Sequence, residues 1–199
     1  DVFLTAGRPP AMKVRGDVVV LDEPPVHGAD LEALSSLGLP ASRRERLATS
    51  GSVDFGLEVP NAVGRPIRFR ANVFRHREGL AAALRPLRER IPTLDELALP
   101  RALQKVVTAP HGLVVFTGPT GSGKTTTLAA LVQHLNETRA IHVVTLEDPI
   151  EYVFEGRRAL IHQREIGTHA ESFASGLRAA LRESPDVILV GEMRDPETI

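Results

Sequence analysis

Hydrophobic and polar residues alternate strictly along two stretches in the first part of the chain, residues 53–59 and 67–73. Alternation with a period of two is typical of strands that bury one face, so we expect these stretches to pair. Shorter apolar runs predict further strands at residues 2–5, 12–14, 18–21 and 80–84, and helices are expected at 30–37 and 41–48. The pattern therefore predicts a small α+β domain over residues 1–90 with an antiparallel sheet.

The pattern changes after residues 91–100, which we interpret as a linker. Thr93 and Glu96 within it have the spacing of a helix capping box. From residue 101 onward, short continuous apolar runs alternate with segments of helical periodicity. Strands are expected at 113–117, 141–146 and 187–190. Helices are expected at 101–108, from residue 124 onward and at 172–183. The helix from residue 124 has one apolar face, formed by Leu128, Leu131, Val132 and Leu135, and the helix at 172–183 is expected to turn inward Phe173, Leu177, Ala180 and Leu181. This alternation predicts a parallel α/β sheet in a second domain, residues 101–199.

Composition narrows the function classes. The 199 residues are 42% hydrophobic, carry a formal net charge of -1 and include no cysteine. A near-neutral chain is not a bulk nucleic-acid binder, and the lack of cysteine excludes disulfides and fits a reducing cytoplasm. No apolar run reaches the roughly 20 residues that span a bilayer. Because the sequence starts without Met and stops just after a motif, we expect it to be a fragment cut at both ends.

A phosphate-binding loop lies between the expected strand at 113–117 and the helix that follows it. Its sequence fits GxxxxGK[ST], in which glycines let the backbone wrap closely around an anion. Lys124 is expected to reach the β- and γ-phosphates and the Thr125 hydroxyl to face Mg²⁺. The expected nucleotide-binding residues are Gly118, Pro119, Thr120, Gly121, Ser122, Gly123, Lys124, Thr125 and Thr126.

Acidic residues end two of the expected parallel strands. Glu147 and Asp148 follow one strand and Glu192 follows another. Carboxyl ends of parallel strands share one edge of a sheet, and ligands bind there. The acids are therefore expected to converge on the phosphates, with Glu192 and Glu147 in catalysis and Glu147 and Asp148 near the metal, directly or through water. The sequence does not decide which acid is the base and which holds Mg²⁺.

Three stretches of this part of the chain resemble the ATPases of type II secretion and type IV pilus systems: residues 145–151, 163–166 and 177–195. The chain is most similar to the pilus retraction ATPases, the PilT-like branch that drives twitching motility. The resemblance implies that residues 147–151 are the Asp box and 186–192 the Walker B motif. It also implies a PAS-like N-terminal domain before a truncated RecA-like P-loop NTPase domain, and a homo-hexamer.

A basic stretch, residues 65–90, carries eight arginines against two glutamates, a local net charge of +6. A solvated basic face explains most of these arginines. The resemblance singles out Arg70 and Arg85 as arginines that contact nucleotide during catalysis. Nucleic-acid binding is the less favoured interpretation, because few stacking aromatics are interleaved.

The function expected from these features is an ATP-hydrolysing, Mg²⁺-dependent motor subunit that powers pilus retraction. The resemblance implies a cytoplasmic protein, peripheral at the inner membrane, that acts on a platform protein of that membrane without inserting directly. Three alternatives stay open: a pilus assembly or type II secretion ATPase with the same chemistry, a non-hydrolysing nucleotide-gated regulator, and a RecA-type nucleic-acid motor. Phosphate release separates the regulator from the ATPases, and stimulation by DNA identifies the nucleic-acid motor.

Overall fold

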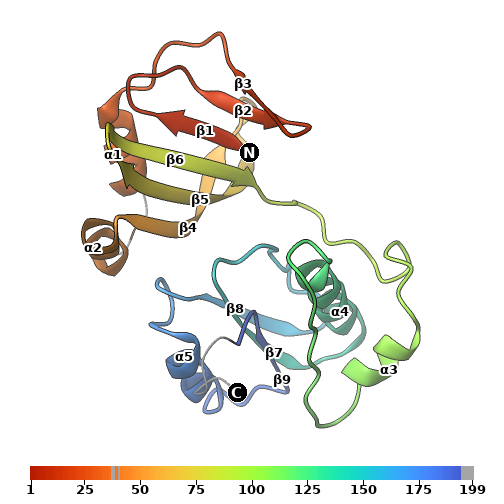
Figure 1. Ribbon diagram of the computed structural model, residues 1–199. Coiled ribbons are helices and arrows are strands. Elements are labelled where there is room, and N and C mark those ends of the chain that lie inside the picture. The colour runs from red at the N-terminus through yellow and green to blue at the C-terminus, as the bar shows by residue number, and fades with distance from the viewer. Residues whose placement is uncertain (37–38, 40, 194–199) are drawn as a thin grey trace. The chain divides into compact units, whose positions relative to one another are not determined.

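The computed structural model describes residues 1–36, 39 and 41–193, and the chain divides into two compact units (Figure 1). Unit 1 is Asp1–Leu87 and unit 2 is Arg88–Ile199. The residues expected to form a linker, 91–100, fall within unit 2.

Unit 1 is a six-stranded antiparallel sheet with two helices. Its elements are β1 (Val2–Thr5), β2 (Ala11–Val14), β3 (Asp17–Val20), α1 (Gly28–Ser36), α2 (Ala41–Ser50), β4 (Ser52–Pro60), β5 (Pro66–His76) and β6 (Gly79–Pro86). The strand order is β3-β2-β1-β6-β5-β4. Every strand and both helices expected from the pattern are present, although Leu37 at the end of the first expected helix lies outside the described residues.

The core of unit 1 lies on one face of this sheet. Alternation in β4 and β5 turns Val53, Phe55 and Val73 to the same side, where all three are buried. Leu31 of α1 and Leu47 of α2 are buried in the same cluster. The helices therefore cover the face that the period-two pattern makes apolar.

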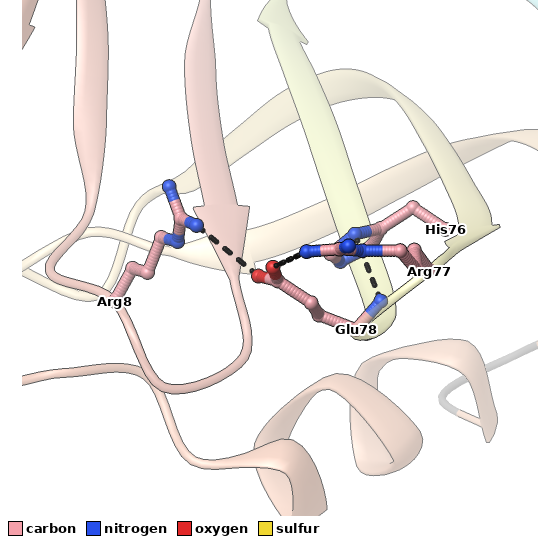
Figure 2. A network of polar contacts seen from close by, with 4 residues as sticks. All are labelled: Arg8, His76, Arg77 and Glu78. Carbon is pink, nitrogen blue, oxygen red and sulfur yellow. Dashed lines mark hydrogen bonds and ion pairs between the residues drawn. The ribbon is translucent and has the colours of Figure 1, made fainter.

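A small ion-pair network links the loop after β1 to the turn between β5 and β6 (Figure 2). Glu78 in the turn accepts hydrogen bonds from Arg77 at 3.0 Å and from Arg8 at 3.1 Å. The Arg77 bond, and then the Arg8 bond, lower the pKa of the Glu78 carboxyl below its ordinary value. Because the network is exposed, it adds little to stability.

Within residues 88–193, unit 2 contains a three-stranded parallel sheet and three helices. Its elements are α3 (Ala102–Val107), α4 (Lys124–Thr138), β7 (His142–Glu147), β8 (Leu160–Glu165), α5 (Phe173–Ala180) and β9 (Val187–Val190). The order β8-β7-β9 puts β7 in the middle, and its Val143, Val144 and Leu146 are fully buried. The central position of β7 explains its continuous apolar sequence. The expectation missed β8, because residues 160–165 mix apolar, polar and charged side chains without alternating.

The expected strand at residues 113–117 is wrong. The structure describes this segment without assigning it to a strand, and Leu113 and Val115 are 79% and 56% exposed. Residues 113–116 line one side of a cavity of about 540 Å³, and β9 lines another side of the same cavity. Leu131 and Leu135 of α4 also contribute to its wall. An apolar run becomes a strand only where a neighbouring strand accepts its hydrogen bonds, and here the cavity separates it from β9.

Two helix expectations also need correction. Thr93 and Glu96 do form both bonds of a capping box, at 2.8 and 3.2 Å, but residues 94–98 make only turns. Ala98 has a positive φ of 50°, which ends helical geometry at that point. The helix expected at residues 172–183 ends earlier than predicted, because α5 stops at Ala180. Leu181, which was expected to point inward, lies just after α5 and is 68% exposed.

Candidate nucleotide-binding site

The glycine-rich loop of unit 2 has the backbone that its sequence demands. Gly118, Gly121 and Gly123 all have positive φ, at 154°, 81° and 92°. A Cβ on Gly118 would lie 2.9 Å from the Ser122 Oγ, so a larger residue would clash within the loop. Helix α4 begins directly after Gly123, and its N-terminal N–H groups give this end a partial positive charge that favours an anion.

Lys124 places its ammonium group over the loop. Its Nζ donates hydrogen bonds to the Gly118 carbonyl at 2.8 Å and to the Pro119 carbonyl at 2.9 Å. Thr125 follows in the first turn of α4 with an exposed side chain. The loop therefore offers a cation, a hydroxyl and a helix N-terminus within one short segment.

The strand-end acids lie on neighbouring strands, as the parallel sheet predicts. Leu146 of β7 is opposite Val190 of β9, and the Gly191 N–H donates to the Leu146 carbonyl at 2.8 Å. A Cβ on Gly191 would approach that carbonyl oxygen to 3.2 Å, so glycine permits the close pairing. Glu147 and Glu192 thus leave adjacent strands at the same edge, and half-buried Glu192 lines the cavity described above.

Glu147 is a buried carboxylate with a perturbed pKa. Its side chain accepts hydrogen bonds from the Thr145 hydroxyl at 2.6 Å and the Gln163 amide at 3.1 Å. Burial raises the pKa of the Glu147 carboxyl above its ordinary value, and the bonds from Thr145 and Gln163 oppose that rise. Perturbed carboxylates of this kind gather at functional sites.

A chain of hydrogen bonds connects Glu147 to the helix that follows the phosphate loop. Gln163 on β8 bonds both Glu147 and the Tyr152 carbonyl, the latter at 2.8 Å. The Tyr152 hydroxyl lies 3.3 Å from the Thr126 Oγ1, in the first turn of α4. The Gln163 carbonyl oxygen also accepts a hydrogen bond from the Phe154 N–H at 2.9 Å, so both the NH₂ group and the oxygen of this amide are hydrogen-bonded. The strand-end acid and the phosphate loop therefore belong to one connected structure.

Sequence reasoning missed several residues of this arrangement. The motifs and spacings of the sequence assign no role to Gln163, Tyr152 or Thr145. Glu165, at the end of β8, is buried and accepts the Ile150 N–H at 3.1 Å, which fastens the loop after β7. The sequence signal at this place is that residues 163–166 carry part of the family resemblance.

The expected metal ligands are oxygen donors, the type that Mg²⁺ takes. Thr125 and Asp148 are exposed, whereas Glu147 is buried and its Oε1 already accepts two hydrogen bonds. Among the described residues, no group of three or more His, Cys, Asp or Glu side chains could hold a metal ion.

Arg70 and Arg85 belong to unit 1, where they are direct cross-strand partners on β5 and β6. Arg85 forms a bidentate pair with Asp1, at 2.9 and 3.2 Å, and Arg70 lies 3.5 Å from Asp54. Residues opposite each other in an antiparallel pair project to the same face. The two arginines singled out from the sequence therefore share one place on the open face of the sheet.

The described part of the chain contains no helix long and apolar enough to cross a membrane. The longest described helix, α4, has 15 residues.

Comparison with known proteins gives consistent matches. A model of the family described as "Type II/IV secretion system protein" matches residues 51–199. The chain is 43% identical over all of its 199 residues to a Pseudomonas aeruginosa protein named "Type IV pilus retractation ATPase PilT". It is 44% identical over 190 residues, 96% of the chain, to the "Twitching motility protein" of Neisseria gonorrhoeae. The chain belongs to the type II/IV secretion system protein family.

A solved structure of this kind, the pilus retraction motor PilT with bound ADP, is similar to this member of the family. It matches with a TM-score of 0.87 and 46% identity over 99% of this chain. The chain spans 57% of both the solved chain and the Pseudomonas protein, and 50% of the Neisseria protein. The resemblance found in the sequence is therefore confirmed at the level of the family.

Proposed function

We propose that this chain is part of an ATP-hydrolysing motor subunit that powers pilus retraction. The observation that carries the proposal is the hydrogen-bonded connection from Thr126 of α4 through Tyr152 and Gln163 to Glu147. It joins a phosphate loop to a buried acid at the end of the sheet, as a site for phosphoryl transfer requires. Relatives named for pilus retraction and twitching match nearly all of this chain, which favours this branch over assembly or secretion.

In the proposed site, unit 2 is a RecA-like P-loop NTPase domain. Residues 118–126 bind the triphosphate through loop N–H groups, and Lys124 exchanges its carbonyl partners for phosphate oxygens. The Thr125 hydroxyl would be a ligand for Mg²⁺, and Asp148 and Glu147 would act on the metal directly or through water. The metal would neutralise charge on the β- and γ-phosphate oxygens.

Glu192 is the proposed general base. It would accept a proton from water as the water oxygen bonds to the γ-phosphorus and the bond to the β-phosphate oxygen breaks. Glu147 supports the reaction from the adjacent strand. Arg70 and Arg85 of unit 1, which we propose is a PAS-like domain, would stabilise charge on the transferred phosphoryl group.

The proposed assembly is a homo-hexamer in the cytoplasm, peripheral at the inner membrane and in contact with a platform protein there. Nucleotide turnover would drive the motor, since contacts to the γ-phosphate differ before and after hydrolysis. Neither nucleic-acid binding nor direct membrane insertion is part of the proposal.

Replacing Lys124 tests the proposal. Lys124→Ala in the full-length protein should reduce ATP hydrolysis on the order of 10²-fold or more, because the triphosphate loses its compensating cation. Lys105→Ala, which changes an exposed lysine on α3, is the matched control and should leave hydrolysis unchanged. Phosphate release measured for both variants decides, and wild-type hydrolysis by Lys124→Ala would contradict the proposed site.

A further inference from the structure

The segment between β7 and β8, residues 150–159, contains no helix or strand, but its backbone is held from two sides. We call this segment the strap. Connecting segments ordinarily run over the surface, where water satisfies their backbone groups. In the strap, Tyr152 and Ala159 are buried, with exposed fractions of 4% and 5%, and side chains of β8 and α4 bond its backbone.

On one side, two residues of β8 hold the first half of the strap. The Glu165 Oε2 accepts the Ile150 N–H at 3.1 Å. Gln163 donates to the Tyr152 carbonyl at 2.8 Å and accepts the Phe154 N–H at 2.9 Å. Because Gln163 and Glu165 are two residues apart on a strand, both side chains project to the same face. The beginning of the strap is therefore fixed to one face of β8.

On the other side, Asn136 of α4 holds the second half of the strap. Its side chain is fully buried, and its Nδ2 donates to the Glu155 carbonyl at 2.7 Å while its Oδ1 accepts the Arg157 N–H at 3.0 Å. Its backbone carbonyl accepts the N–H groups of Arg158 at 2.8 Å and Ala159 at 3.3 Å. Carbonyls in the last turn of a helix have no partner within the helix, so the strap also caps the end of α4.

The strap follows α4 along most of the helix. The Tyr152 hydroxyl lies 3.3 Å from the Thr126 Oγ1 in the first turn, and Asn136 is in the last turn. Between these two points, Phe154 packs against the cluster that contains Val132 of α4. Ten residues of helix rise about 15 Å, a length that about five extended residues can cover. One short segment therefore reaches both the end of α4 that carries the phosphate loop and the opposite end.

The strap also begins next to the acids, because Glu147 and Asp148 directly precede it. We propose that the strap fixes α4, and with it the phosphate loop, relative to these strand-end acids, and that Asn136 is the positioning residue that holds the strap in place. Asn136 lies in the last turn of α4, at the end opposite the phosphate loop, and acts only through the strap. The inference deepens the proposed function and rests on it where turnover is measured, since phosphoryl transfer depends on exact placement of the reacting groups.

Amide hydrogen exchange on the full-length protein tests the strap without relying on hydrolysis. Asn136→Ala removes the acceptor of the Arg157 N–H, which should exchange about tenfold faster. If the strap acts as one unit, the Phe154 N–H should accelerate by a similar factor, although its partner is Gln163. The Val144 N–H of β7 should not change. Unchanged exchange at Phe154 would overturn the proposal, as would equal acceleration at Val144, which would mean that Asn136 only supports the fold.

Turnover and affinity separate positioning from binding. Asn136→Ala should lower ATP turnover by about tenfold or more and leave ATP affinity within about threefold, because the phosphate loop itself is unchanged. Glu137→Gln, at the neighbouring exposed position of α4, is the matched control and should keep full turnover. Normal turnover in Asn136→Ala would overturn the role of Asn136. A wild-type protein that does not hydrolyse ATP would refute the proposed function, and the exchange measurement would still decide whether the strap acts as one unit.

Asn136→Asp keeps the shape of the side chain and tests the hydrogen bond to the strap directly, even if Asn136→Ala fails to fold. An ionised carboxyl group can accept the Arg157 N–H but cannot donate to the Glu155 carbonyl, whereas a protonated one can do both. Because burial favours the protonated form, the ratio of variant to wild-type turnover should rise at least about threefold from about pH 8 to about pH 6. A low ratio that does not rise as the pH falls would overturn the proposal.

Discussion

Glu147 ties the stability of unit 2 to pH through its buried carboxyl group. Burial raises its pKa above the ordinary 4.5, so the folded chain keeps this proton to a higher pH than the unfolded chain does. Raising the pH through that interval therefore removes stability. In Glu147→Gln this contribution is absent, so the free energy of unfolding of the variant should rise relative to that of the wild type between pH 4 and pH 7.5.

Tyr152 makes this measurement selective. It is the only tyrosine, the chain has no tryptophan, and it is buried in unit 2 beside the site. Urea unfolding of residues 1–199, followed by tyrosine fluorescence at both pH values, gives the free energy of unfolding. A difference between variant and wild type that is independent of pH would contradict the raised pKa.

The Gln163 side chain forms hydrogen bonds with three groups, so replacing it should leave all three without this partner. Gln163→Ala removes the donor to Glu147 and the Tyr152 carbonyl and the acceptor for the Phe154 N–H. Leaving such buried groups unsatisfied should lower the free energy of unfolding by about 1–3 kcal/mol. Leu160→Ala, an exposed position on the same strand, is the control and should change stability less. Equal losses in the two variants would mean that the hydrogen bonds of Gln163 do not matter.

At the scale of single residues, the motif indicates which glycines shape the backbone of the phosphate loop. Gly118 and Gly121 needed positive φ, and the structure gives it to both. Gln163 and Tyr152 could not be assigned, because each acts through backbone groups or side chains brought close only by folding. No local spacing records such a contact.

The pairing of β5 with β6 sharpens the expectation for Arg70 and Arg85. Because they are cross-strand partners on one face, an anion that approaches one also meets the other. Arg70→Ala and Arg85→Ala should each lower ATP turnover on the order of 10²-fold or more, with a much smaller change in ATP affinity. Arg77→Ala and Arg88→Ala should change little, and all four variants should be compared in the full-length protein.

The outcomes of that comparison are distinct. If all four variants lose activity equally, the arginines of the basic stretch act through their combined positive charge and not through two residues that contact the phosphate. If none loses activity, the arginines that act on the phosphate lie elsewhere in the protein. Asp1→Asn adds a further check, since it releases Arg85 from its bidentate pair without altering either arginine.

The segment before the phosphate loop should limit what residues 1–199 can do alone. Residues 113–117 are not hydrogen-bonded into the sheet and are largely exposed, so the loop is anchored mainly through α4. We expect this chain to bind ATP weakly and to hydrolyse it at least about tenfold more slowly than the full-length protein. Calorimetry and phosphate release on both proteins test this, and full-length activity in residues 1–199 would contradict it.

At the scale of elements, alternation and helical periodicity predicted unit 1 nearly in full. They failed at residues 113–117, where an apolar run has the composition of a strand but meets a cavity in place of a neighbouring strand. Alternation and periodicity also failed at β8, because its polar side chains Gln163 and Glu165 hydrogen-bond to groups of the candidate site. Sequence pattern reports which side of an element is buried, and it does not report whether a hydrogen-bonding partner is present.

For the whole molecule, membership of the type II/IV secretion system protein family rests on residues 51–199 and on relatives matched along the entire chain. The chain spans 57% of the Pseudomonas relative, so the activity of the complete protein is the central proposal. The proposal requires that nucleotide binding and hydrolysis depend on different residues of unit 2. In the proposal, Lys124 and the loop bind the nucleotide, whereas Glu192, just after β9, acts in the chemical step.

Glu192→Gln in the full-length protein separates these two roles most directly, because it keeps the shape of the side chain and removes its charge. ATP affinity should stay within about threefold of the wild type, while turnover should fall by about 10²-fold or more, the scale of a positioned general base. Glu171→Gln, at an exposed position before α5, is the control and should retain full turnover. Wild-type turnover by Glu192→Gln, with ATP bound normally, would contradict the account.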